Sequence, residues 1–178
     1  MNILIEKYGN SGIYVDLGCS EERSMTKQLE DAGWKGLHID ARLNYAVYSH
    51  NGFVDFYDLK EVSPALKFFS GVKYKLNESE IQKHLPAVDV LANLETKKVE
   101  CKTLETILDE NNLKNISFLK VDIEGSEREV FRVFPFDKFN IDYILIEGFY
   151  CNDILISNGF KFIECINDRD YLYEHIHS

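Results

Sequence analysis

Short apolar runs that end on an acidic residue are the main pattern along this chain. The first run lies in residues 13–19, where the acid is Asp16, and the second lies in residues 36–40, where the acid is Asp40; both are too short for a typical helix. Runs of this length are typical of strands buried on both faces of a parallel sheet, so each final acid is expected at the carboxyl edge of that sheet. Four strands are predicted to carry such an acid, namely Asp16, Asp40, Asp122 and Glu147.

Strands and helices are predicted to alternate along most of the chain. Further strands are predicted over residues 52–57, 116–122 and 143–147. Helices are predicted after Thr103 and Ser126, and over residues 44–49 and 153–158. This alternation indicates an α/β fold built around a mostly parallel sheet.

Two segments depart from the parallel pattern. Apolar runs at 160–166 and 171–175 flank the turn-forming segment 167–170, which predicts a hairpin and an antiparallel pair that closes the sheet. Residues 58–98 show no sustained period. We interpret them as an insertion near the carboxyl edge that forms a substrate loop or lid.

Composition and charge narrow the class of protein. With 178 residues, of which 45% are hydrophobic, the chain fits a single domain over residues 1–178, either alone or as one domain of a longer protein. The formal net charge of −10 argues against a nucleic acid or an anionic membrane as the main partner. No apolar run reaches the length of a membrane span. The four cysteines lack metal-ligand spacing, which predicts reduced thiols in a cytoplasmic protein.

The turn after the first strand indicates which cofactor the sheet binds. A dinucleotide site needs several glycines, whereas this turn has Gly18 followed by Glu21 and Glu22, whose charges would repel a pyrophosphate. S-adenosylmethionine carries no phosphate and has two cationic groups, so it suits an acid-rich turn. Asp40 can then accept hydrogen bonds from the ribose hydroxyls. An ordinary strand-turn-helix with solvated glutamates is the alternative.

Several blocks of the sequence resemble the FkbM-type methyltransferases. These blocks are Val15-Asp16-Leu17-Gly18 and residues 33–40, 103–108, 118–127, 146–148 and 154–160. The D-x-E-G block at 122–125, with its flanking hydrophobic residues, is the most specific of them. The resemblance covers most of the chain and leaves residues 58–98 unmatched.

The resemblance implies a Rossmann-like class I methyltransferase. Its sheet would be mostly parallel and seven-stranded, with an antiparallel C-terminal hairpin and helices on both faces. The implied reaction is S-adenosylmethionine-dependent methylation of a hydroxyl on a small molecule or glycan, most commonly a sugar. Fusion to, or association with, glycosyltransferase domains would fit such an acceptor. The alternative is a catalytically inactive S-adenosylmethionine-binding module that acts as a scaffold in a larger assembly.

The predicted site residues form a catalytic group and a cofactor-binding group. Asp122, Glu124 and Glu147 are the catalytic candidates, because O-methylation needs a base or a metal that lowers the hydroxyl pKa. The same three carboxylates could hold Mg²⁺ or Mn²⁺, and a metal-free site with one carboxylate or His38 as base is the alternative. The predicted cofactor-binding residues are Asp16, Gly18, Cys19, Ser20, Ser24, Asp40, Ala41, Asp58 and Asp122.

Overall fold

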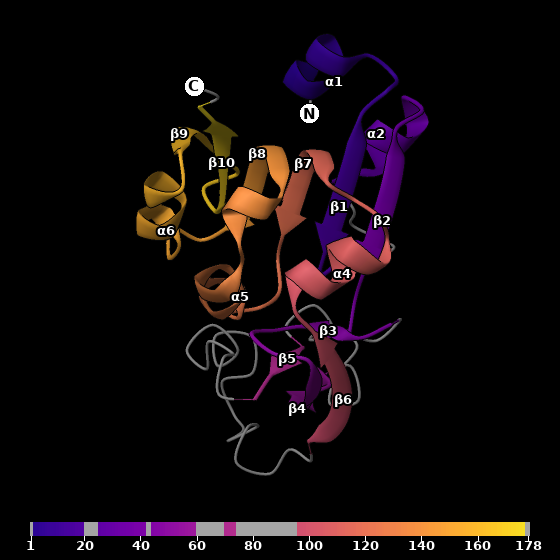
Figure 1. The fold of residues 1–178 in the computed structure, drawn as a ribbon, viewed down its shortest axis with the longest axis vertical. Coiled ribbons are helices and arrows are strands. Elements are labelled where there is room, and N and C mark those ends of the chain that lie inside the picture. The colour runs from indigo at the N-terminus through magenta and orange to yellow at the C-terminus, as the bar shows by residue number, and fades with distance from the viewer. Residues whose placement is uncertain (1, 20–24, 42–43, 60–69, 74–95, 177–178) are drawn as a thin grey trace.

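A six-stranded sheet is the largest element of the computed structural model, which describes residues 2–19, 25–41, 44–59, 70–73 and 96–176 (Figure 1). In spatial order its strands are β2 (Lys35–Ile39), β1 (Ile13–Leu17), β7 (Asn115–Val121), β8 (Asn140–Glu147), β10 (Asp170–His175) and β9 (Phe160–Ile166). The first four strands are parallel to one another, whereas β10 is antiparallel to both of its neighbours. The mixed α/β class and the C-terminal hairpin therefore match the sequence predictions.

Helices cover both faces of this sheet, because its strands are apolar on both sides. On one face Leu119 and Val121 of β7 share a core with α4 (Leu104–Glu110), α5 (Glu127–Val133) and α6 (Asn152–Ser157). On the other face Phe118 packs in a second core with α1 (Asn2–Tyr8) and α2 (Lys27–Asp31). A single 3-10 turn, η4 (Phe136–Lys138), connects α5 to β8.

A smaller sheet lies beyond the end of the main sheet at which β1 and β7 finish (Figure 1). Its strands, in spatial order, are β3 (Ala46–Val47), β6 (Lys97–Lys102), β4 (Gly52–Tyr57) and β5 (Gly71–Val72). It has its own core, in which Val54 and Phe56 pack with Cys101. The carboxyl edge of the main sheet therefore faces a second folded layer.

The seven-stranded sheet is not confirmed, because the main sheet has six strands within the described residues. Residues 52–57 do form a strand, β4, but it pairs with β5 and β6 in the smaller sheet. The pattern of apolar residues along a segment predicts that the segment is extended. It does not predict which other strand that segment pairs with.

Two local predictions between the second and fourth predicted strands also need correction. Residues 44–49 form the short strand β3 with bends around it, in place of the expected helix. Residues 97–102 form β6, which begins within the last two residues of the segment that we interpreted as an insertion and was not predicted as a strand. Its strand pattern is weak in the sequence because Lys97, Lys98 and Glu100 are exposed and Cys101 is its one fully buried residue. The other described parts of 58–98 are residues 58–59, 70–73 and 96, so most of the predicted substrate loop lies outside the described residues.

Candidate functional site

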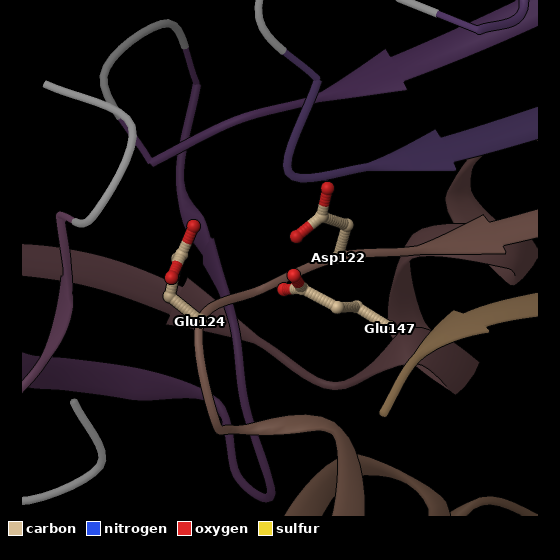
Figure 2. Close-up of side chains that lie close together, drawn as sticks. All are labelled: Asp122, Glu124 and Glu147. Carbon is tan, nitrogen blue, oxygen red and sulfur yellow. The ribbon is translucent and has the colours of Figure 1, made fainter. Parts of the chain in front are cut away.

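Three carboxylates meet at the carboxyl edge of the main sheet. Asp122 follows β7, Glu147 ends the adjacent strand β8, and Glu124 lies on the turn beyond β7. One carboxylate oxygen from each residue lies within 4.8 Å of the other two. Figure 2 shows the three side chains turned into the same space. The structure thus brings together the residues that were predicted to be catalytic.

The turn that carries Glu124 has an unusual backbone. Glu124 has a φ of 53° and Gly125 has a φ of 93°, so two successive residues adopt left-handed conformations. The buried Glu127 at the start of α5 stabilises this turn, because its Oε1 accepts hydrogen bonds from the amides of Ile123 (2.9 Å) and Gly125 (3.3 Å). A left-handed conformation at a residue other than glycine costs free energy and is concentrated at functional sites.

Burial and mutual repulsion shift the pKa values of these acids. Burial raises the pKa of Glu124 to about 9, and repulsion from Asp122 and Glu147 adds to this effect. The pKa of Glu147 rises to about 7, first because of burial and then because of Asp122. The positive charge of Arg169, whose Nη1 lies 3.5 Å from Glu147 Oε1, lowers the pKa of Glu147 and so offsets part of this rise. At neutral pH the cluster therefore holds a proton unless a cation replaces it.

A buried lysine links this cluster to the first strand. Lys120 is 6% exposed, and its Nζ lies 3.3 Å from Asp122 Oδ2 and 3.3 Å from Asp16 Oδ1. Burial opposes the positive charge, but the two carboxylates outweigh burial and raise the lysine pKa. Asp16 is fully buried and also accepts a 2.7 Å hydrogen bond from Thr26 Oγ1. Asp16 thus lies inside the sheet and supports Lys120.

Sequence analysis assigned no role to Lys120 or to Glu127. The sequence did contain an indication for Lys120, because it is a single cationic residue within the apolar run of β7. A buried lysine requires an acidic partner nearby. For Glu127 the signal was weaker, because an acid at the start of a helix is common.

Gly18 is required by close packing at the end of β1. Its φ is 78°, and a Cβ on this residue would lie only 1.6 Å from the carbonyl oxygen of Asp122. Its amide donates a 2.8 Å hydrogen bond to the carbonyl of Ile39. The glycine therefore lets the first turn lie directly against the end of β7, and its own N–H group is used within the protein.

Cys19 and Asp40 lie beside this turn. Cys19 is buried, and its pKa rises to about 12, first because of burial and then because of the negative charges of Asp16 and Asp40. A thiol with such a pKa is a poor nucleophile, which agrees with a packing role. Asp40 follows β2 directly and is 7% exposed. The structure thus gathers Asp16, Gly18, Cys19 and Asp40 next to Asp122.

The remaining predicted cofactor-binding residues either lie beside the smaller sheet or fall outside the residues that the structure describes. Ala41 packs against the core of the smaller sheet, and Asp58 follows β4, with its Oδ2 3.7 Å from Lys97 Nζ. Ser20 and Ser24 lie outside the described residues, as do Glu21 and Glu22. His38, the alternative base, contacts the Tyr14 hydroxyl (2.8 Å) and Glu30 Oε1 (2.7 Å) rather than the three carboxylates.

The arrangement supports two kinds of chemistry at one place. Three carboxylates offer the hard oxygen ligands that Mg²⁺ and Mn²⁺ prefer. In the absence of a metal, an acid with a pKa near neutrality can accept a proton from a bound hydroxyl. Both Asp122 and Glu147 are partly exposed, with 33% and 28% of their side-chain surface accessible to solvent, so a ligand can reach them.

Comparison with known proteins identifies the family. A family model described as the methyltransferase FkbM domain matches residues 4–164, which include the first turn and all three carboxylates. Neither the curated proteins nor the solved structures gave a match. Because the family model spans most of the sequence, the chain belongs to the FkbM methyltransferase family.

Proposed function

We propose that this chain is an S-adenosylmethionine-dependent O-methyltransferase whose acceptor is a hydroxyl on a sugar or glycan. The observation that carries the proposal is the cluster of Asp122, Glu124 and Glu147 beside the first turn of the sheet. Family membership supports the methyl transfer, and the clustered acids support an acceptor that must lose a proton.

The residues around the first turn suit S-adenosylmethionine. Asp40 stands at the end of β2, where a carboxylate can accept hydrogen bonds from two ribose hydroxyls. The single positive charge of Lys120 offsets only one of the two nearby carboxylates, Asp16 and Asp122, so this edge keeps a net negative charge, which favours a ligand with cationic groups. When bound, S-adenosylmethionine supplies a methyl group on a positively charged sulfur.

Glu147 is our choice for the residue that accepts the hydroxyl proton. As the acceptor oxygen forms its bond to the methyl carbon, the bond between that carbon and sulfur breaks and its electron pair stays on sulfur, so that neutral S-adenosylhomocysteine leaves. The hydroxyl proton passes to a Glu147 carboxylate oxygen. A pKa of about 7 leaves a large fraction of this carboxylate ionised near neutral pH. Lys120 forms an ion pair with Asp122 next to Glu147. Glu124 stays protonated near neutral pH, because its pKa is raised to about 9.

A divalent cation is the alternative way to activate the hydroxyl. Asp122, Glu124 and Glu147 would hold it, and their oxygen donors fit Mg²⁺ or Mn²⁺. Such an ion, when bound, lowers the pKa of a coordinated hydroxyl. The carboxylates would then all be ionised, because the cation replaces the proton.

Binding of S-adenosylhomocysteine tests the cofactor assignment. Isothermal calorimetry should show that Asp40→Ala loses about 1.5–3 kcal/mol of binding free energy, the scale for a charge-assisted hydrogen bond. Asp55→Ala is the matched control, because Asp55 lies on β4 and pairs with Lys98. Equal affinity in wild type and Asp40→Ala would contradict the ribose assignment.

Turnover tests the catalytic assignment. Glu147→Gln should lower the methylation rate at least about a hundredfold while S-adenosylhomocysteine affinity changes little, since a positioned base or metal contributes on that scale. Glu164→Gln, at an exposed position of β9, is the control. Loss of activity with EDTA and recovery with Mg²⁺ or Mn²⁺ would assign a metal, and activity that resists EDTA would assign a side-chain base. Cofactor binding without turnover on any sugar acceptor would favour the scaffold.

A cytoplasmic location is part of the proposal. The four cysteines are all free thiols, which supports a reducing compartment. Among the described residues, no helix combines the length and apolar character that a membrane crossing requires.

A further inference from the structure

Four aromatic residues form a partly exposed surface near the end of β8, the strand that carries Glu147. Phe149 and Tyr150 follow β8, Phe162 lies on β9, and Tyr171 lies on β10. The exposed fractions are 65% for Tyr150, 49% for Phe149 and 42% for Phe162. The ring of Phe149 lies 5.0 Å from that of Tyr171 and 6.1 Å from that of Phe162. We call these four residues the aromatic platform.

The platform is attached directly to the catalytic edge. Gly148 follows Glu147 and has a φ of 77°, and a Cβ on it would lie 2.2 Å from Cε2 of Tyr150. One edge of the tyrosine ring therefore rests on the backbone next to Glu147. The amide of Gly148 donates a 2.8 Å hydrogen bond to the carbonyl of Arg169, whose guanidinium approaches Glu147. A molecule that lies on Tyr150 is thus close to the end of β8, which carries Glu147.

The loop that carries the platform is braced. Arg128 donates hydrogen bonds to the carbonyl of Tyr150 and, with two nitrogens at 2.7 Å, to both carboxylate oxygens of Asp153. Asp153 lies in the first turn of α6, so the loop is tied to two helices. Rings that are fixed before binding lose little conformational entropy when a ligand arrives.

The shape and chemistry of the platform suit a pyranose ring. Exposed aromatic residues rimmed by charged side chains commonly mark a binding site. A pyranose presents C–H groups on one face, which the negative face of an aromatic ring attracts, and hydroxyls around its edge. Asp168 and Arg169 stand in the turn just before β10, which carries Tyr171, and both are exposed and able to hydrogen-bond to hydroxyls.

We propose that the aromatic platform is the acceptor subsite, with the sugar ring stacked on Tyr150 and Phe149 so that one hydroxyl reaches Glu147. This inference rests on the proposed function and adds to it the surface that selects the acceptor. Tyr150 and Phe149 bind the ring, and Arg169, whose Nη1 lies 3.5 Å from Glu147 Oε1, can hydrogen-bond to a hydroxyl of the same sugar.

Saturation-transfer difference NMR tests the proposal, with a panel of methyl hexopyranosides as probes and S-adenosylhomocysteine present. In wild type, transfer to the ring C–H protons of at least one glycoside is expected. Tyr150→Phe should keep this binding, whereas Tyr150→Ala and Phe149→Ala should each raise the dissociation constant at least about threefold, as loss of a stacking contact predicts. Phe53→Ala, which removes a 67% exposed aromatic ring from β4, should change nothing.

The cofactor product separates the two proposals. All four variants should bind S-adenosylhomocysteine as wild type does and should give the wild-type circular dichroism spectrum. Equal sugar binding by wild type, Tyr150→Ala and Phe149→Ala would overturn the platform and leave the proposed function standing. Absence of sugar binding by wild type with S-adenosylhomocysteine bound would overturn the platform as a sugar site. Failure of folded wild type to bind S-adenosylhomocysteine would overturn the proposed function and the platform with it.

Discussion

Lys120 carries its positive charge in a part of the molecule that water scarcely reaches. Its two partners, Asp16 and Asp122, come from the strand beside it and from the end of its own strand. A buried ion pair contributes little when it is compared with well-packed apolar residues, yet removal of one partner is costly because the other charge stays buried. The lysine therefore links the stability of the sheet to the position of Asp122, a proposed catalytic carboxylate.

We predict that Lys120→Met lowers the free energy of unfolding by about 3–5 kcal/mol, because Asp16 is left buried without its cation. The double variant Asp16→Asn/Lys120→Met should recover much of this loss, since it removes both charges. Urea denaturation monitored by circular dichroism measures all of these values. The control is Lys161→Met, which breaks the exposed pair with Glu174 and should cost at most about 1 kcal/mol. Equal costs for both lysines would contradict the buried-pair argument.

Glu124 gives a prediction about pH. Its pKa in the folded state, about 9, lies above the ordinary value of 4.5, so its contribution to stability is full below pH 4.5 and is lost as the pH rises towards 9. With EDTA present, Glu124→Gln should therefore be more stable than wild type at about pH 8, by at least about 1 kcal/mol, and similar to it at about pH 4. Thermal unfolding at both pH values measures the difference. A stability advantage that is the same at both would contradict the shift, and Glu164→Gln should show no pH-dependent gain.

At the scale of the elements, Thr103 shows how a short signal fixes a helix start. Its Oγ1 accepts a 3.2 Å hydrogen bond from the amide of Thr106, and its own amide donates to Asn51 Oδ1 at 2.9 Å. The sequence predicted this start because threonine before an apolar helical pattern is a favoured cap. The contact with Asn51 lies outside any local pattern.

Thr103→Ala should lower the free energy of unfolding by about 1 kcal/mol, the usual cost of losing a side-chain cap. Thr103→Ser keeps the hydroxyl and should cost much less. Chemical denaturation of the two variants gives the comparison. If alanine and serine are equally destabilising, the loss comes from the methyl group and its packing.

The strands that sequence analysis identified are those with a clear pattern of apolar residues along the chain. β1, β7 and β8 are apolar on both faces, and an acid lies within or just beyond each of them. Strand β6 was not predicted, because its charged and apolar positions alternate only weakly. Helix α1 was not predicted either, because Leu4 is its one buried residue and gives no helical pattern of apolar positions. The hairpin turn was found because Asn167 and Asp168 tolerate the positive φ values, 53° and 60°, that they adopt.

At the scale of the whole molecule, the candidate site was predictable in part. That Asp122 and Glu147 would meet follows from the rule that parallel strands end at one edge. The separation of β4 into a second sheet did not follow, because strand pairing depends on residues far apart in the sequence. The same is true of the Lys120 contact with Asp16 and of the aromatic platform, which combines the loop after β8 with residues of β9 and β10.

The last strand, β10, lies between β8 and β9 although it follows both in the sequence. During synthesis on the ribosome, β8 and β9 therefore emerge before β10, the strand that pairs with both of them. Asp170 of β10 pairs with Glu147, so the edge that carries the proposed base is completed at the same moment. A nascent chain that stops before residue 170 would expose two strand edges, which are prone to aggregate, and would lack a finished site. Completion of the main sheet therefore depends on β10, and products that end before it should be targets for chaperones and proteases.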